Sequence, residues 1–165
     1  QLQPRNKFYN TLNSLAETVL NCGAGINADK HHLCVDVTPK FTQAAHRRGH
    51  DVNCASVLNL PFKDKAFDCV CCENLLIHLQ PKQWMDALTE MKRCASKYVA
   101  TFEPRWREET RYLIRELQYS EDGLLSFYLN EYGVSDMVEF ARGFCRFMQT
   151  AVNVEGDWQI TVYQL

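Results

Sequence analysis

The chain has 165 residues, of which 46% are hydrophobic and 23% are charged, and its formal net charge at pH 7 is −2. These values are typical of one soluble globular domain, and they lack the basic excess of a general nucleic-acid binder. The apolar runs are shorter than the roughly 18 residues that a membrane span requires, so we expect no membrane segment.

The predicted elements alternate between helices and strands along the chain. A leading helix is predicted over residues 1–16, because Phe8, Leu12 and Leu15 recur at helical spacing. Only seven residues separate Gly25 from Leu33, too few for a full helix, so the first crossover helix is shortened or missing. The pattern then predicts strands at 17–22, 33–36, 50–55, 66–72 and 98–102, with a turn at 61–65. Further helices are predicted from 39 to about 49, from 81 to 95, at 106–117 and at 135–140. The chain ends in the predicted arms of a hairpin, at 146–154 and 158–165.

Most of the eight cysteines fall within these apolar strand-like runs. The start of the chain shows no secretory signal pattern, and a domain of this length needs no disulfide bonds. We therefore expect buried, reduced thiols and a cytoplasmic location. Cys69, Cys71 and Cys72 lack the CxxC spacing of a zinc site, so no metal is predicted.

Two neighbouring strand ends carry the features of a nucleoside site. Gly23 and Gly25 directly follow the first predicted strand, and a glycine backbone lets a ligand approach closely. Asp36 ends the second strand, where an acid usually holds a nucleoside ribose. Because parallel strands end at the same edge of a sheet, the two segments predict one site.

These segments, followed by Leu60-Pro61-Phe62 and by the stretch from Phe67-Asp68 to His78-Leu79, resemble the class I S-adenosylmethionine-dependent methyltransferases in order and spacing. The resemblance covers roughly residues 19–104. It implies an α/β three-layer sandwich with a mostly parallel central sheet that ends in an antiparallel hairpin. We treat residues 1–165 as one domain, with a leading helix (1–16), a donor-binding core (17–104), a substrate-side insertion (105–143) and a terminal hairpin (144–165).

The resemblance also implies S-adenosylmethionine as the methyl donor and assigns residues to it. Asn21 stands where the family has an acid near the amino end of the methionine, and Ser56 where an acid often receives the adenine amino group. Asp36 would accept hydrogen bonds from the ribose hydroxyls, and Val57 would offer its backbone amide to the adenine ring. The implied donor-binding residues are Asn21, Cys22, Gly23, Ala24, Gly25, Asp36, Val37, Ser56, Val57 and Cys72.

Two side chains are candidates for catalysis, each with a plain structural alternative. Glu73 follows the fourth strand and either accepts a proton or orients the acceptor, or only complements a helix dipole. His78 is either a base or a hydrogen-bonded structural imidazole. The methyl acceptor is not identified by the sequence; we favour a small molecule and leave nucleic acid and protein open.

Other functions stay open at this stage. A methyltransferase-like scaffold or partner subunit with weak donor binding fits Asn21, Ser56 and the lost helix, and it implies a protein partner. The sequence begins with Gln1 rather than Met, which leaves a larger parent chain open. A nicotinamide-binding domain fits less well. Gly23, Gly25 and Ala28 match GxGxxG/A, but the acid follows Gly23 by thirteen residues instead of about twenty.

Overall fold

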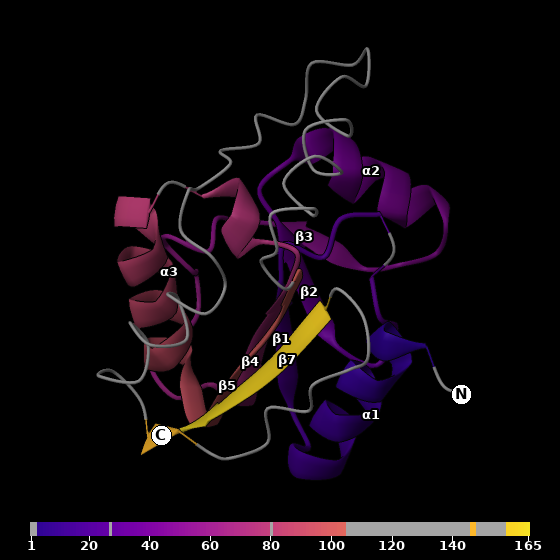
Figure 1. Cartoon of the computed structure of the whole chain (residues 1–165). Coiled ribbons are helices and arrows are strands. Elements are labelled where there is room, and N and C mark those ends of the chain that lie inside the picture. The colour runs from indigo at the N-terminus through magenta and orange to yellow at the C-terminus, as the bar shows by residue number, and fades with distance from the viewer. Residues whose placement is uncertain (1–2, 27, 80, 105–145, 148–157) are drawn as a thin grey trace.

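The computed structural model describes residues 3–26, 28–79, 81–104, 146–147 and 158–165. Within these ranges, helices lie on both faces of one central sheet (Figure 1). The predicted insertion at 105–143, with its two helices, lies outside the described residues. So does most of the first predicted arm of the hairpin.

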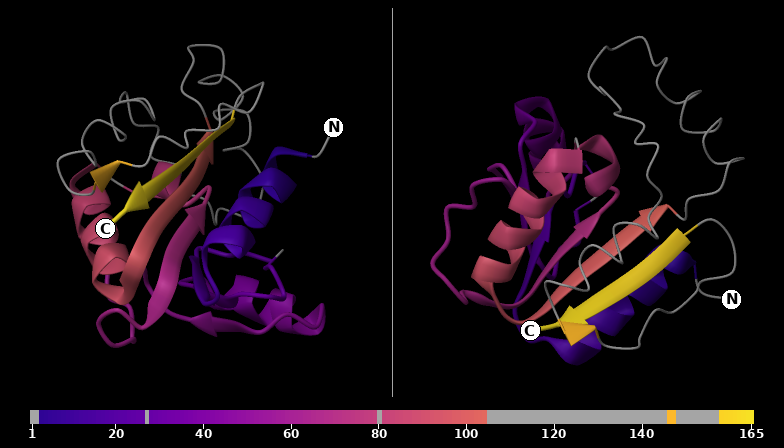
Figure 2. Two further views of the ribbon diagram at one scale, coloured as in Figure 1. Left: turned by 90° about the horizontal axis from the view of Figure 1, so that it is seen from below. Right: turned by 60° about the vertical axis from the view of Figure 1, so that its left-hand side comes forward.

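The central sheet is built from seven strands. They are β1 (Val19–Cys22), β2 (Leu33–Asp36), β3 (Val52–Cys54), β4 (Phe67–Glu73), β5 (Ala95–Pro104), β6 (Arg146–Phe147) and β7 (Trp158–Gln164). Their order in the sheet is β3-β2-β1-β4-β5-β7-β6. The first five pair in parallel, whereas β7 lies between β5 and β6 and runs antiparallel to both (Figure 2). The predicted mostly parallel sheet with an antiparallel end is therefore confirmed.

Three α-helices and one short 3-10 helix accompany the sheet in the described part of the chain. They are α1 (Pro4–Leu15), α2 (Pro39–Arg47), η1 (Leu76–His78) and α3 (Pro81–Cys94). Each α-helix begins at a proline. Proline is well accommodated there, because the first-turn amide that it lacks has no partner within a helix.

The helices divide between the two faces of the sheet, with α3 on one face and α1 and α2 on the other (Figure 1). On the α3 face, Trp84 and Met91 pack against strand residues such as Val70. On the opposite face, the rings of Phe8 and Phe102 stack with their centroids 5.3 Å apart. Both faces of the strands are thus buried, as expected for a largely parallel sheet, and the predicted three-layer arrangement is confirmed.

The connection from β1 to β2 contains no helix in its described residues, 23–26 and 28–32. This confirms the predicted loss of the first crossover helix. The connection is instead fastened to α1. Nε2 of His32 lies 2.8 Å from Oδ1 of Asn13, and the rings of His32 and Tyr9 have centroids 5.3 Å apart.

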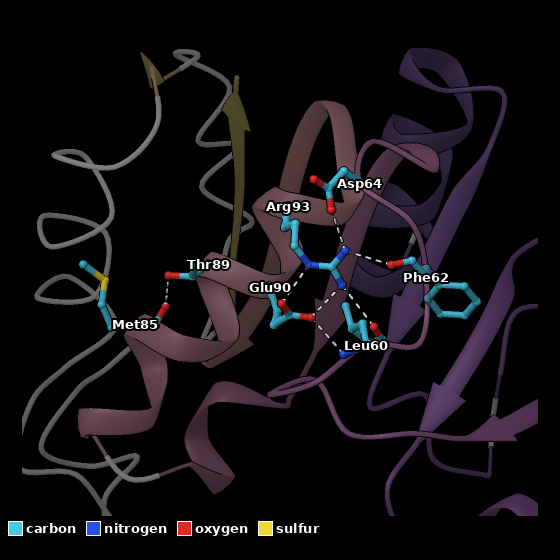
Figure 3. A network of polar contacts seen from close by, with 7 residues as sticks. All are labelled: Leu60, Phe62, Asp64, Met85, Thr89, Glu90 and Arg93. Atoms are coloured by element: carbon cyan, nitrogen blue, oxygen red, sulfur yellow. Dashed lines mark hydrogen bonds and ion pairs between the residues drawn. The ribbon is translucent and has the colours of Figure 1, made fainter.

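The connection from β3 to β4 is held against α3 by Arg93 (Figure 3). Its guanidinium donates hydrogen bonds to the carbonyl oxygens of Leu60 and Phe62, at 3.0 and 2.8 Å, and to the carboxylates of Glu90 and Asp64. Glu90 also accepts a hydrogen bond of 2.9 Å from the Leu60 amide. The predicted turn after residue 60 is therefore confirmed, and α3 fixes its backbone.

Strand β5 is longer than the sequence predicts. The apolar spacing extends the predicted helix to Ala95, but α3 ends at Cys94 and Ala95 pairs with Phe67 of β4. Towards its other end, β5 pairs with β7 from Tyr98 to Pro104. Pairing with β4 therefore overrides the local helical pattern at Ala95.

The seven described cysteines have free thiols, and all except Cys54 are buried. The prediction of buried thiols is confirmed for these six residues. In the described part of the chain, no three potential metal ligands cluster together. The helices of that part are too short or too polar to cross a membrane.

Candidate functional site

A cleft of about 520 Å³ opens beside the carboxyl ends of β1, β2 and β4. Ligands of open α/β sheets bind at this edge. The cleft brings together seven of the predicted site residues, namely Gly23, Ala24, Gly25, Asp36, Val37, Glu73 and His78. It is also lined by Arg5, Ile26, Thr38, Phe41, Asn74, Leu75 and Leu79.

The two glycines after β1 have positive φ angles for different reasons. Gly23 has a φ of +69°, and an added Cβ would lie 2.7 Å from Cδ1 of Leu75. Gly25 has a φ of +60°, but an added Cβ would meet no atom within 4 Å. Gly23 therefore allows Leu75, just before η1, to pack closely against the loop after β1. Gly25 leaves open space on the cleft side of the same loop.

Asp36 is held at the tip of β2 by backbone amides. Its side chain accepts a hydrogen bond of 2.9 Å from the Gly25 amide at Oδ2 and one of 2.8 Å from the Thr38 amide at Oδ1. The residue is 6% exposed. Each carboxylate oxygen has two acceptor sites, so both oxygens retain capacity for another donor. Asp36 can thus receive a pair of neighbouring hydroxyl groups.

At the opposite end of the cleft, Glu73 is paired with two residues of α1. Nε of Arg5 donates to both carboxylate oxygens of Glu73, at 2.7 and 2.9 Å, and the Tyr9 hydroxyl donates to Oε2 at 2.6 Å. The Arg5 guanidinium also lies 4.8 Å from the centroid of the Tyr9 ring. These contacts with Glu73 therefore hold α1 at the carboxyl end of β4.

The hydrogen bonds behind Glu73 have a defined direction. Asn21 is fully buried, and its Nδ2 donates to the Tyr9 hydroxyl at 3.0 Å. Burial, and then the charge of Glu73, raise the pKa of Tyr9 well above its usual range, so the hydroxyl keeps its proton at neutral pH. That proton is donated to Glu73. The chain of donors thus runs from Asn21 through Tyr9 to the carboxylate.

His78 lies half-buried at the end of η1 and faces the cleft. Burial lowers its pKa below the usual value of 6.5, and the charge of Asp36 partly opposes this shift. The imidazole is therefore mostly uncharged at neutral pH. An uncharged imidazole has one nitrogen that accepts a proton.

The segment that carries His78 is fixed from the far side. Oε1 of Glu103 accepts hydrogen bonds of 3.0 Å from the amides of both Leu75 and Leu76. The indole nitrogen of Trp84 donates to the Leu76 carbonyl at 2.9 Å. Contacts from β5 and α3 thus position one wall of the cleft.

The other predicted donor-binding residues do not line the cleft. Cys22 and Cys72 are fully buried in the core beneath α3, and Asn21 is buried behind Tyr9. The Ser56 hydroxyl accepts a hydrogen bond of 3.2 Å from the Leu58 amide, and Val57 is 6% exposed.

Half of the residues that line the cleft were not among the predicted site residues. Thr38 and Phe41 follow the Asp36 strand end and begin α2, a position from which an apolar side chain reaches the ligand edge of the sheet. Their place after a strand-end acid was a usable signal. The pairing of Arg5 with Glu73 carries no such signal, because 68 residues separate the two.

Solved structures of low sequence identity share this fold. A SAM-dependent methyltransferase from Thermotoga maritima, described as a possible histamine N-methyltransferase, has a TM-score of 0.66 and 16% identity, and the match covers 96% of this chain and 86% of that one. A magnesium protoporphyrin IX methyltransferase from Synechocystis with bound S-adenosylhomocysteine has a TM-score of 0.65 and 12% identity, over 99% and 88% of the two chains. The sheet order and the cleft thus define a class I methyltransferase fold.

Sequence comparison matches part of the chain to a protein family. Residues 19–98 match a family model described as "Methyltransferase domain". With the shared fold, this match, which covers just under half of the chain, supports the class I S-adenosylmethionine-dependent methyltransferase family.

A probable tRNA methyltransferase 9B from Bos taurus is 33% identical over 79 residues, which are 45% of this chain and 17% of that protein. The chain spans only 34%, 17% and 18% of the lengths of three curated relatives that it matches.

Proposed function

We propose that this chain binds S-adenosylmethionine in the cleft and transfers its methyl group to an acceptor. The observation that carries the proposal is Asp36, a buried carboxylate at the tip of β2 whose oxygens are oriented by the amides of Gly25 and Thr38. A carboxylate in this position suits the two hydroxyls of a ribose.

The residues around Asp36 fit the rest of the molecule. Binding sites for small ligands and cofactors are about 300–1,000 Å³ in volume, and the cleft, at about 520 Å³, falls within that range. The backbone from Gly23 to Gly25 would pass beneath the ligand, and Val37 and Phe41 would supply apolar contacts for the base. Bound S-adenosylmethionine supplies a methyl group on a positively charged sulfur, ready for in-line displacement.

The chain's own contribution is to position the reactants, exclude water and accept a proton. Leu75 and Leu79 form an apolar wall beside the cleft. Of the two predicted catalytic side chains, we assign the proton-accepting role to His78, because its lowered pKa leaves it uncharged near pH 7. Glu73 already accepts hydrogen bonds from Arg5 and Tyr9, which suits a binding role better.

Titration calorimetry of the folded protein tests donor binding. We expect S-adenosylmethionine and S-adenosylhomocysteine to bind with micromolar affinity and NAD, as the control, to give no heat. NAD should fail because the described residues after Gly25 form no helix whose amino end could receive a pyrophosphate. Absence of binding by both sulfur nucleosides would contradict the proposal.

A second candidate is a methyltransferase-like scaffold that binds the donor weakly or not at all. It is favoured by Ser56 and Val57, which do not line the cleft although the family resemblance assigns them to the adenine. If a folded protein binds neither sulfur nucleoside, the scaffold becomes the leading function. A search for protein partners then replaces the acceptor screen.

For the acceptor we favour a small molecule, since the net charge of −2 gives the chain no general attraction for nucleic acid. The name of the bovine relative makes tRNA the first macromolecule to test. Transfer of a radioactive methyl group into small-molecule pools, tRNA and protein, measured in parallel, separates the three classes. Incorporation into tRNA alone would overturn the small-molecule preference.

A further inference from the structure

We propose that Glu103, which does not line the cleft, is a positioning residue of the candidate site. Through one buried carboxylate oxygen it holds the wall that carries His78 against the glycine loop after β1. The loop serves the donor and His78 serves the acceptor, so one side chain aligns both halves of the reaction. This meaning rests on the proposed function, because it assumes that the cleft holds the donor.

The sheet fixes the position of Glu103. It is the penultimate residue of β5, whose pairing with β4 extends to Phe102 and whose pairing with β7 extends to Pro104. Successive residues of a strand face opposite sides of the sheet. The ring of Phe102 stacks on Phe8 of α1, and the side chain of Glu103 accordingly points to the other side, where η1 and α3 lie. Glu103 is fully buried there.

The backbone after β4 is shaped to receive an anion. Asn74 has a φ of +51°, in the left-handed region, and Leu75 follows in the right-handed helical region with φ −99° and ψ −46°. Such a pair turns successive N–H groups to one side and forms a concave anion site. Oε1 of Glu103 occupies that site, 3.0 Å from the amide nitrogens of both Leu75 and Leu76. These amides begin a helix and have no acceptor within it, so the carboxylate supplies one.

The two amides connect Glu103 to both sides of the cleft. Leu75 packs so closely against the glycine loop that a Cβ added to Gly23 would lie 2.7 Å from its Cδ1. Leu76 begins η1, which ends at His78. A displaced carboxylate would therefore release Leu75 from the loop and the imidazole from its place in the same movement.

His78 reports its own position, because two surroundings set its pKa. Burial lowers this pKa, and the charge of Asp36 partly opposes the shift. If η1 moves towards solvent, the effect of burial is lost and the midpoint of His78 rises towards about 6.5. Proton magnetic resonance of the ligand-free protein measures this midpoint, and His78→Gln identifies the resonance among those of the five histidines. A role of Glu103 in overall stability alone would not move it.

Two variants separate the length of the Glu103 side chain from its charge. Glu103→Asp keeps the carboxylate but is shorter by one carbon, so it cannot reach both amides. The midpoint of His78 should then rise towards about 6.5. Glu103→Gln keeps the length and one carbonyl oxygen, so the midpoint should rise less than in Glu103→Asp.

Asp68→Asn is the matched control. Asp68 is a carboxylate of β4 that accepts a hydrogen bond of 3.0 Å from the Glu17 amide, and it does not line the cleft. Its loss should lower the melting temperature and leave the midpoint of His78 unchanged. An unchanged midpoint in Glu103→Asp, or an equal rise in Asp68→Asn, would overturn the positioning role.

A second measurement needs no variant, should Glu103→Asp fail to fold. The amides of Leu75 and Leu76 in the parent protein should exchange slowly with solvent, because a buried carboxylate accepts their hydrogen bonds. Exchange as fast as that of the exposed Lys63 would contradict the inference.

Titration of the parent with S-adenosylhomocysteine tests the proposed function separately. A bound ligand would fill the cleft that Asp36 and His78 both line, and should change the His78 midpoint. If this nucleoside does not bind while Glu103→Asp still raises the midpoint, the positioning of the wall stands and the proposed function fails alone. If it binds and Glu103→Asp has no effect on the midpoint, the inference fails alone.

Discussion

The two ends of the cleft each present a carboxylate, but they support it by different means. Asp36 is held by the amides of Gly25 and Thr38, which are eleven and two residues away. Glu73 is held by the side chains of Arg5 and Tyr9, which are 68 and 64 residues away. The first support comes from local backbone geometry and the second from the docking of a helix. The Asp36 end should therefore tolerate changes elsewhere, while the Glu73 end should depend on α1.

The largest expected effect is a loss of stability at the Glu73 end. Asn21→Asp would add a buried carboxylate beside Glu73, so we expect the free energy of unfolding to fall by about 3 kcal/mol at pH 7. Burial and the neighbouring charge would raise the pKa of the introduced carboxyl above about 3.9, its value in the unfolded chain. The deficit should therefore be smaller at pH 5 than at pH 7, and it should disappear in acid.

Urea denaturation across this pH range measures that effect. Asn10→Asp, an exposed position on the same helix, is the control and should change stability little. If both variants are as stable as the parent, the Glu73 end does not depend on an uncharged partner at position 21.

The next effect concerns the Asp36 end. Asp36→Ala should weaken donor binding by about 2 kcal/mol, because a carboxylate that receives hydroxyl groups is lost. Calorimetry with S-adenosylhomocysteine gives the affinity, and circular dichroism checks that the variant is folded. Asp51→Ala removes an exposed carboxylate outside the cleft and serves as the control. Unchanged affinity in a folded Asp36→Ala variant would remove Asp36 from the site.

A smaller effect is expected from a substitution at the Glu73 end that changes no charge. Tyr9→Phe deletes only the hydroxyl that connects Asn21 to Glu73, so we expect the free energy of unfolding to fall by about 1 kcal/mol. Tyr98→Phe, at a partly buried tyrosine on β5, is the matched control. Thermal denaturation measures both. Equal stability of the two variants would mean that the hydroxyl contributes nothing beyond the packing of its ring.

The smallest effect is a shift in the titration of His78, which reports on Asp36. Proton magnetic resonance should give a midpoint below 6.5 for His78, because burial disfavours the charged ring. Asp36→Ala should lower the midpoint further, since the charge of Asp36 opposes the shift. The pKa of His78 is lower in the folded protein than in the unfolded chain, where it is about 6.5. The uncharged ring therefore contributes fully to the free energy of unfolding above about pH 6.5, and this contribution is lost as the pH falls through the folded pKa. A midpoint above 6.5 would contradict this account.

The same contrast explains what the sequence could predict. The Asp36 end follows from short-range signals, which are an apolar run ending in an acid, two glycines spaced by one residue, and a proline that begins the next helix. Short-range signals of the same kind predicted the strands, the missing first helix and the antiparallel pair. Gly23, Gly25 and Asp36 accordingly line one cleft, as predicted.

The contacts at the Glu73 end could not be predicted from the sequence, because the partners of Glu73 are distant along the chain. Arg5 and Tyr9 stand on a helix whose apolar spacing predicts packing on the sheet but not which strand end it meets. Asn21 suggested weakened donor binding when taken alone, and the role of its amide emerges only beside Tyr9. The start of β5 was also not predicted, because pairing with β4 outweighed a local helical pattern at Ala95.

The docking of α1 has a consequence for where this unit begins. Residues 19–104 carry all five parallel strands, yet Phe8 and Leu12 fill the core on one face of the sheet and are fully buried. A polypeptide trimmed to the strands would expose this apolar surface to water and invite self-association. The minimal expressible unit therefore begins ahead of the first strand, at or before Pro4, and any truncation series should keep the entire leading helix.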